Sequence, residues 1–468
     1  MATVPFSPRM HLAATRGFRF TALLVAVIIL AVLFPGLHFE AHLNWTFSAG
    51  LFLAGIILLS APLRGRNPDL FNPACLFPAA YCIWFAAGSL DVVPEVYQFS
   101  LFDPIPLRMW GYYALGLAGY WLGMRGGGQT VVAMPGGERL RRTWDSRRFG
   151  FAMTGLILMG TAMYLYLVSR GGIPVLRDDW AESRVEIGLQ NGIVFTAFLS
   201  ALWTAIPMLF AFLWIEERSW VLRWEVYALV GVLALMLFSM GSRGLVFIPA
   251  LIVVIVRHYL VRPWKLASLL AGGSAVFAFI GVVGYLRDYQ VSNSLESFGF
   301  APWVVPLAPA YLYVRAPVAT LRDVTALISE RNIFQHGALF LSPFAVLAPG
   351  HHLSSDLFFK ALLRHNFVGF GEPATLLGVF YGDFGVPGIF FGMVAVGLLA
   401  RWSYGAMRCR RSPLTTLLFS YYAYVMLFSL FGTLFPYLIT LWIPLMFVAV
   451  DRFARRSLAG SESATCPI

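Results

Sequence analysis

Charged residues are scarce in this sequence: Asp, Glu, Lys and Arg make up 12% of the chain, against 59% hydrophobic residues. A soluble domain typically carries about 25% charged residues, so the composition excludes an ordinary water-soluble fold. Cysteine is also rare, and the positions of Cys75, Cys82, Cys409 and Cys466 fit neither a disulfide framework nor a zinc site. The 41 Phe and 14 Trp residues suit a surface that faces lipid.

A nucleotide-binding signature is missing as well. The longest basic loop, residues 125–148, is rich in glycine, but the pattern GxxxxGK[ST] does not occur in it. The remaining loops on that side leave no room for a soluble nucleotide-binding domain. We therefore expect chemistry that needs no direct ATP use, no metal and no cofactor.

Long apolar runs dominate the rest of the chain. A run of about 17–25 apolar residues can span a bilayer, and the sequence predicts twelve such spans within a single integral membrane domain, residues 1–468. They are 19–36, 43–62, 71–89, 106–124, 149–169, 193–215, 225–240, 244–261, 266–286, 386–404, 413–430 and 433–450. The predicted fold class is an all-α polytopic membrane protein.

The arginines predict the orientation. With the N-terminus inside, the cytoplasmic segments hold 23 of the 34 basic residues but only 8 of the 23 acidic ones. This asymmetry is typical of a membrane protein whose basic loops face the cytoplasm. We expect both termini in the cytoplasm of a bacterium and the chain in its inner membrane. The net charge of +11 is then a consequence of topology and not of nucleic-acid binding.

Two substantial segments remain on the outer side, 170–192 and 287–385. The second contains two proline-interrupted apolar pieces, 301–314 and 337–350, which we expect to lie at the interface or to re-enter without crossing. Residues 316–331 and 354–366 predict amphipathic helices, the first with Pro317 near its first turn and Leu321, Val324 and Ile328 on one face. The second is predicted to begin at Ser354 or Ser355 and to repeat apolar residues at 357, 358, 361 and 362. These helices would carry Arg315, Arg322, Arg364 and His365 at the outer rim.

Arg243 stands in the stretch FSMGSRGLVFIP between two apolar spans. We expect GSRG to form a tight turn at the outer surface. An arginine there can snorkel to the interface or bind an anion, and a guanidinium binds phosphate oxygens in pairs. Arg177 and Arg184 would supply further guanidinium groups, although Asp178 and Asp179 can instead pair with them.

The candidates for a general base lie late in the outer segment. A neutral imidazole or a carboxylate of raised pKa near arginines can deprotonate a sugar hydroxyl. Arg287 and Arg315 are further candidate supporting residues. The candidate bases are His351, His352, His365, Glu372 and Asp383.

Three stretches, in this order along the chain, resemble the O-antigen polymerase family of oligosaccharide repeat-unit polymerases. They are GGIPVLRDDWAESRVEIG, GSRG and GEPATLLGVFYGDFGVPG, and together with the twelve spans and the late outer loop the resemblance covers most of the chain. The related O-antigen ligases share a boundary arginine and a late-loop histidine. The pair RHN and DFGVPG is similar to theirs, with longer spacing.

The resemblance implies a metal-independent, inverting glycosyltransferase of the C-type membrane superfamily that makes O-antigen or exopolysaccharide on the outer face of the inner membrane. Its substrates would be glycans on undecaprenyl diphosphate, and a chain-length regulator protein is an expected partner. Arg177, Arg184, Arg243 and Arg364 would bind the diphosphate. His365 or Glu372 would act as the catalytic base.

Two alternatives stay open. A ligase would transfer the finished glycan to lipid A core or to protein with a similar site. A flippase for lipid-linked oligosaccharides would need charged residues deep along a central path and is often built from internal repeats, and the sequence shows neither.

Overall fold

The structure is a computed structural model. It describes residues 42–60, 69–90, 103–125, 144–177, 183, 186–188, 190–216, 220–241, 243–287, 308–345, 355–364, 372–410, 412–432 and 438–455. Within these ranges the regular structure is helical, apart from an isolated β-bridge between Trp144 and Arg455. The helices are α2 (His42–Ser60), α3 (Pro73–Ser89), α4 (Leu107–Arg125), α5 (Ser146–Gly171), η3 (Pro174–Leu176), α7 (Gly192–Glu216), α8 (Trp220–Ser239), α9 (Arg243–Leu260), α10 (Leu266–Arg287), α12 (Ala308–Arg331), α13 (Ala338–Ala345), α14 (Ser355–Leu363), α15 (Thr375–Arg410), α16 (Pro413–Phe428) and α17 (Leu438–Ala454).

These helices confirm the all-helical prediction. Ten of the predicted apolar segments match a helix to within five residues at each end, and segment 386–404 lies inside the longer α15. Segment 19–36 lies outside the described residues. Three described stretches are long and apolar enough to cross a membrane, namely Ser146–Leu176, Gly192–Ile215 and Thr375–Arg410, and five shorter apolar helices accompany them. The number twelve remains a prediction.

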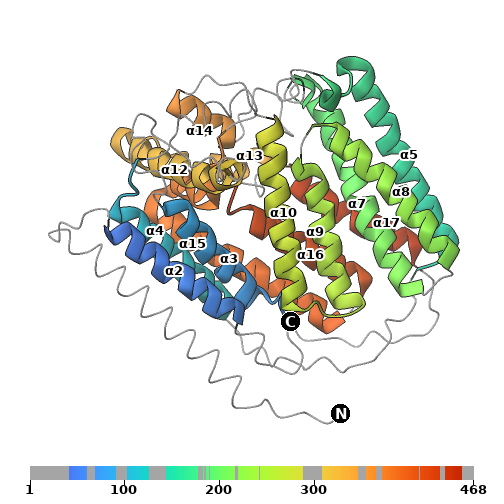
Figure 1. Ribbon diagram of the computed structural model, residues 1–468, viewed down its shortest axis with the longest axis horizontal. Coiled ribbons are helices and arrows are strands. Elements are labelled where there is room, and N and C mark those ends of the chain that lie inside the picture. The colour runs from blue at the N-terminus through green and yellow to red at the C-terminus, as the bar shows by residue number, and fades with distance from the viewer. Residues whose placement is uncertain are drawn as a thin grey trace, which may run out of the picture.

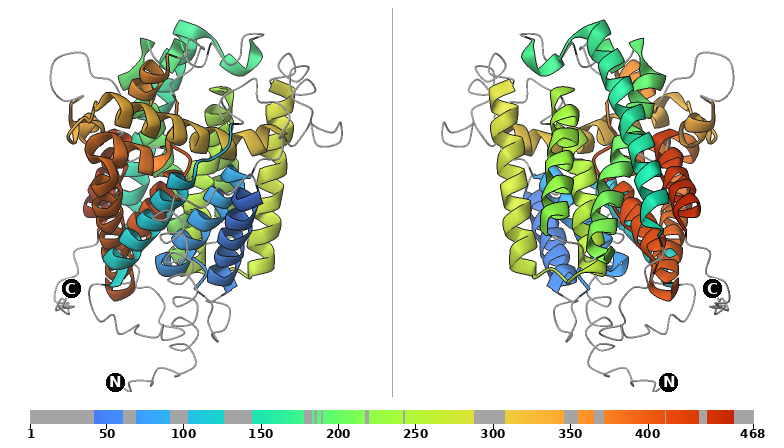
Figure 2. Two further views of the ribbon diagram at one scale, coloured as in Figure 1. Left: turned by 90° about the vertical axis from the view of Figure 1, so that its left-hand side faces the viewer. Right: turned by 90° about the vertical axis from the view of Figure 1, so that its right-hand side faces the viewer.

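Most helices run side by side, and one layer lies across their ends (Figures 1 and 2). We call the layer of α12, α13 and α14 the cap, and the end of the bundle that it covers the cap end. The loop between α9 and α10 lies at the opposite end, which we call the basal end. Figure 2 shows α12 running across the bundle while α2, α3, α4 and α15 pass beneath it.

The cap corrects several expectations from the sequence. Helix α12 begins at Ala308, inside the proline-rich stretch, because Pro309 falls in its first turn, where a missing N–H costs no helical hydrogen bond. Pro317 consequently lies within the helix and not at its start. The predicted apolar face is confirmed, since Leu321, Val324 and Ile328 are buried.

Helices α13 and α14 are short. With eight residues, α13 is too short to cross a membrane, as its sequence predicted. In α14 the predicted apolar face is wrong in part: Ser355, Phe359 and Leu362 are the buried residues, whereas Ala361 is exposed.

The apolar interior forms two clusters. The first is built mainly by α2, α3, α4, α12 and α15 and the second by α5, α7, α8, α9 and α17. Helix α16 contributes to both, with Phe419, Ala423 and Met426 in the first and Leu417 and Tyr421 in the second. The cap therefore packs on the first cluster, to which α12, α13 and α14 contribute buried residues.

Glycines allow α4 and α15 to touch along their backbones. A Cβ atom built on Gly119 would lie 2.5 Å from the carbonyl oxygen of Phe390, and one on Gly123 would collide with that of Val394. From the other side, Gly397 approaches the backbone of Tyr120 equally closely. Small residues that let helix backbones approach are typical of packing inside membranes, where apolar side chains gain nothing by leaving lipid.

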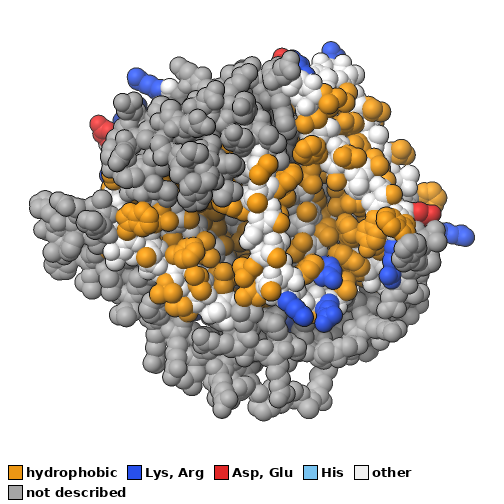
Figure 3. All heavy atoms as spheres, in the orientation of Figure 1, with side chains coloured by type: hydrophobic (Ala, Val, Ile, Leu, Met, Phe, Trp, Pro, Cys, Tyr) orange, Lys and Arg blue, Asp and Glu red, His pale blue; other side chains and the backbone are white. Residues whose placement is uncertain are grey.

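The outside of the bundle is apolar over much of its length. Figure 3 shows a band of hydrophobic side chains over α8, α9 and α10, with charged side chains above and below it. Residues Phe151, Leu158 and Leu165 on α5 are 72%, 64% and 59% exposed, and the outer sides of α2, α10, α15 and α17 carry similar residues. An exposed apolar surface of this extent indicates contact with lipid.

Candidate functional site

The cap end brings together segments that are far apart in the sequence. The end of α5 with η3, the turn between α8 and α9, the cap helices and the start of α15 all lie there (Figures 1 and 2). These segments carry Arg177, Arg243, Arg364, Glu372 and Asp383. The described parts of GGIPVLRDDWAESRVEIG and GSRG and the start of GEPATLLGVFYGDFGVPG therefore lie at the same end of the bundle.

Asp383 lies immediately before a break in α15. At Gly385 the backbone adopts φ 65° and ψ −147°, a conformation that glycine reaches without strain, and the helix resumes after it. The fully buried carboxylate of Asp383 accepts the backbone N–H groups of Leu339 at 3.0 Å and Phe340 at 2.9 Å. These are N–H groups of the first turn of α13, which have no partner within their own helix.

The loop before α13 is fastened to the same break. The N–H of Gln335 donates to the carbonyl of Gly382 at 2.9 Å, and the N–H of His336 donates to that of Asp383 at 3.0 Å. Asp383 thus fixes α13 against α15. Its two oxygens are occupied by backbone donors, so the geometry favours a positioning role over that of a base.

Glu372 lies just before α15 and is tied to α14. Its backbone N–H donates to the carbonyl of Asp356 in the first turn of α14 at 3.0 Å. Its side chain is half-buried. Arg364 lies just past the other end of α14, exposed, with φ 58°. Because a helix rises about 1.5 Å per residue, Asp356 and Arg364 are separated by about 12 Å along α14.

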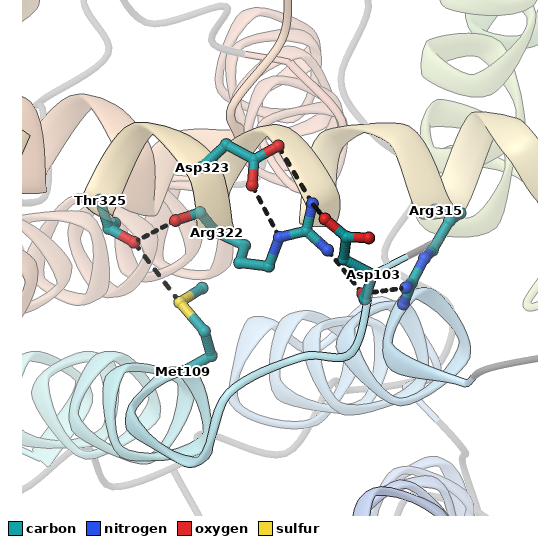
Figure 4. A network of polar contacts seen from close by, with 6 residues as sticks. All are labelled: Asp103, Met109, Arg315, Arg322, Asp323 and Thr325. Atoms are coloured by element: carbon teal, nitrogen blue, oxygen red, sulfur yellow. Dashed lines mark hydrogen bonds and ion pairs between the residues drawn. The ribbon is translucent and has the colours of Figure 1, made fainter. Parts of the chain in front are cut away.

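Arg315 and Arg322 lie on the underside of α12, two turns apart (Figure 4). Arg315 donates to the carbonyl oxygen of Gly88, at the end of α3, at 2.8 Å and to that of Asp103, before α4, at 2.9 Å. Arg322 donates to the same Asp103 carbonyl and forms a bidentate pair with Asp323, at 2.7 and 3.1 Å.

Both arginines face the protein interior, and whether they lie at the outer rim of the membrane stays a prediction. Arg315 is fully buried and Arg322 is 5% exposed. A buried guanidinium is tolerated when its N–H groups are hydrogen-bonded, and carbonyls at the ends of helices provide acceptors that the helices leave open. We call these contacts the arginine clamp, because they hold α12 across α3 and α4.

The remaining arginine candidates lie at helix ends. Arg177 follows η3, is exposed, and donates to the carbonyl of Gly171 at 3.2 Å. Arg243 is the first residue of α9, after a turn in which Gly241 adopts φ 76°. The predicted tight turn between the seventh and eighth apolar segments is therefore confirmed.

Several predicted site residues lie outside the described residues. These are Arg184, His351, His352 and His365, together with the side chains of Arg243 and Arg287. Their assigned roles stay predictions.

A polar cluster at the basal end was not anticipated from the sequence. Asp69, just before α3, accepts the hydroxyls of Tyr259 at 2.7 Å and Tyr404 at 2.5 Å, and it lies 3.6 Å from Nε2 of His258 and 4.0 Å from Arg408. The isolated acid in the stretch RNPDLFNP was the only signal in the sequence.

The charge of Asp69 is stabilised within this cluster. Burial alone would raise the pKa of its carboxyl, but hydrogen bonds from His258, Tyr404 and Tyr259 outweigh burial and hold the pKa below its ordinary value. Because the Trp264 N–H donates to Nδ1 of His258, the imidazole directs Nε2–H at Asp69. Asp69 thereby ties α3, α9 and α15 together.

Among the described residues, no group of three or more His, Cys, Asp or Glu side chains lies close enough to hold a metal ion. Metal-independent chemistry stays an expectation from the sequence. No family model, no curated protein and no solved structure matches this chain.

Proposed function

We propose that this chain polymerises oligosaccharide repeat units linked to undecaprenyl diphosphate, at the cap end of a twelve-span bundle in the inner membrane. The observation that carries the proposal is that η3, the start of α9, α14 and the start of α15 all lie at the cap end, above an apolar helical body. This arrangement supplies exposed guanidinium groups and a carboxylate at one end, where lipid-linked substrates would present their headgroups.

The proposed reaction is an inverting transfer. The bond between the anomeric carbon of the growing glycan and the phosphate oxygen breaks, and a bond forms from that carbon to a hydroxyl of the acceptor repeat unit. Undecaprenyl diphosphate leaves with the bonding electron pair. The hydroxyl proton passes to the base, Glu372 or His365. Because the anomeric carbon gains oxocarbenium character, stabilising the leaving diphosphate is the main task of the site.

The arginines would perform that task. Arg177, Arg184, Arg243 and Arg364 would bind the diphosphate and neutralise the charge that develops on it. The separation of about 12 Å between Arg364 and the attachment point of Glu372 on α14 leaves room for a sugar ring between the leaving group and the base. The cap helices would guide the two lipids into this site.

The described buried charges favour transfer at one end over passage through the bundle. Arg315, Arg322 and Asp383 lie at the cap end, whereas His258 and Asp451 are within the last four residues of α9 and α17. A flippase would place such residues along the path between the two ends. This distribution argues for an enzyme and leaves a ligase as the closest alternative.

Deletion of this protein from its host distinguishes the three candidate activities, namely polymerase, ligase and flippase. Loss of a polymerase removes long surface glycans and leaves single units on the final acceptor, provided the host ligase accepts single units. Loss of a ligase accumulates long glycan on the lipid carrier, and loss of a flippase traps single units on the inner leaflet. We expect the first pattern in gels of surface glycan and in mass spectra of the lipid-linked pool. The second pattern would make the protein a ligase.

Arg243 provides the test at residue level. A phosphate-binding guanidinium does not tolerate lysine, whereas a snorkelling residue does. At matched membrane abundance, Arg243→Lys should lose long polymer as Arg243→Ala does, while Arg331→Ala, an exposed arginine at the end of α12, should retain it. Near-normal polymer with Arg243→Lys would remove Arg243 from the site.

A further inference from the structure

The loop between α9 and α10 presents three basic residues at the basal end. Arg262 and Lys265 are exposed, and Arg257 is half-buried, in the last turn of α9. Neither Arg262 nor Lys265 takes part in an ion pair within the described part of the chain. Figure 3 shows basic side chains gathered at the lower ends of α9 and α10, directly below the hydrophobic band.

This loop is held in place by specific contacts. The indole N–H of Trp264 donates to the carbonyl of Val254 at 2.9 Å, and its backbone N–H donates to Nδ1 of His258 at 3.1 Å. The guanidinium of Arg257 lies over the Trp264 ring, 4.0 Å from its centroid. A cation over an indole face is attracted by the ring. The loop is therefore ordered before any ligand arrives.

Helix α10 rises from this loop with little protein around it. Of the α10 residues whose burial the structure describes, only Gly281 is buried, and Leu270, Phe277, Phe279 and Val282 are exposed. Where such a surface meets a membrane, acyl chains cover it. Basic residues at its base then lie at the level of the lipid phosphates.

We infer that the α9–α10 loop and the exposed face of α10 form a docking surface for an anionic phospholipid of the leaflet at the basal end. The headgroup contacts Arg262 and Lys265, and the acyl chains lie along α10. Charge complementarity selects the ligand, because a cluster of Lys and Arg beside an apolar face attracts anionic lipids. The surface lies at the opposite end from the proposed transfer site, so this inference does not depend on glycosyl transfer.

The test uses the full-length chain purified in a neutral detergent and titrated with phosphatidylglycerol or phosphatidylcholine of the same acyl chains. A ligand that binds only the folded state raises its thermal stability with concentration, so thermal unfolding reports the apparent affinity. We expect phosphatidylglycerol to stabilise the protein at lower concentration than phosphatidylcholine does. Inorganic phosphate alone should have no effect, because it cannot cover α10.

The double variant Arg262→Gln/Lys265→Gln should lower the apparent affinity for phosphatidylglycerol about thirtyfold, since two basic residues at about 1 kcal/mol each give that factor. The control Arg170→Gln/Arg331→Gln removes two exposed charges at the cap end and should leave the affinity unchanged. Equal responses to the two lipids, or an unchanged response in the first variant, would overturn the inference. Stabilisation by phosphate alone would replace the lipid with a free anion.

Discussion

The two apolar clusters share close ring packing but differ in the contacts that are added to it. In the second, large rings stack closely, with the Trp144 and Phe149 centroids 5.0 Å apart and those of Phe149 and Phe212 4.3 Å apart. In the first, Gly119 and Gly123 bring two helix backbones into contact, and buried arginines satisfy the ends of helices. Rings also pack closely in the first cluster, where the Phe85 and Tyr113 centroids lie 4.4 Å apart. What sets the first region apart is the added backbone contact of α4 with α15 and the buried arginines at helix ends.

The difference follows what each region supports. A layer that lies across helix ends leaves carbonyl and N–H groups without helical partners, and the first region satisfies them with Arg315, Arg322 and Asp383. In the second region the arginines at helix ends are more open to the surroundings, as with exposed Arg177, which donates to the Gly171 carbonyl at the end of α5. The region under the cap should therefore respond to substitutions that the other region tolerates.

The largest difference in stability between the two regions should come from replacing a glycine. In Gly123→Ala the added methyl group meets the Val394 carbonyl, and because both partners are backbone, the helices must separate. We expect a loss of several kcal/mol, in the range of severe overpacking. In Gly155→Ala on α5 nothing lies within 4 Å, and the change should stabilise that helix by up to about 1 kcal/mol. Thermal unfolding in detergent measures both changes in stability. Equal effects of the two substitutions would contradict the proposed difference between the two regions.

The arginine clamp should show the next largest effect. Arg315→Met keeps most of the apolar stem but removes the Arg315 donor from the Gly88 carbonyl and one of the two arginine donors from the Asp103 carbonyl, at a cost of about 1–3 kcal/mol. In the second region, Arg455 is 57% exposed in its pair with Asp451, so Arg455→Met should cost under about 1 kcal/mol. Denaturant or thermal unfolding checks the ranking. A cost for Arg455→Met that matched that of Arg315→Met would contradict it.

Replacing Asp383 distinguishes a positioning role from that of a catalytic base. Asp383→Asn keeps one acceptor for the α13 N–H groups, so we expect a stability loss of about 1 kcal/mol. Polymer formation should fall while its pH profile keeps its shape. The matched change Asp451→Asn in the second region should lower stability without shortening the polymer. A pH profile that loses its acid limb in Asp383→Asn would instead identify Asp383 as the base.

The smallest effect concerns pH at the basal end. The folded-state pKa of Asp69 lies below its ordinary value, so its charge stabilises the folded protein above the ordinary carboxyl pKa of about 3.9. That contribution disappears as the pH falls through the lower, folded-state pKa. Asp69→Asn should therefore be less stable than the parent at neutral pH, by about 1 kcal/mol, and the difference should vanish in acid. Parallel unfolding curves at all pH values would show that the charge contributes nothing.

The sequence alone was sufficient to predict those features of the fold that depend on a local pattern. Hydrophobic runs predicted the helix positions, the spacing of Leu321, Val324 and Ile328 predicted the buried face of α12, and GSRG predicted the turn before α9. Each of these depends on residues within a few turns of one another.

The remaining features depend on distant partners. The burial of Arg315 is decided by carbonyls at Gly88 and Asp103, more than two hundred residues earlier. Likewise, Asp383 takes its role from α13, some forty residues earlier. No local pattern records such pairings. The contact of α4 with α15 had a usable signal, since Gly119 and Gly123 are spaced as small residues are in membrane helix pairs.

The position of α16 between the two clusters affects how the two regions can move relative to each other. Its side chains enter both clusters, with Phe419 and Met426 on one side and Leu417 and Tyr421 on the other. A rotation of α16 about its own axis would disturb the packing of both clusters at once. If α16 instead tilted together with one cluster, only its packing against the other cluster would change. Helix α9 also contributes to both clusters, with Ile255 in the first and Ile252 in the second. A relative motion of the two regions would therefore have to repack both α9 and α16, and we expect the regions to move as one unit.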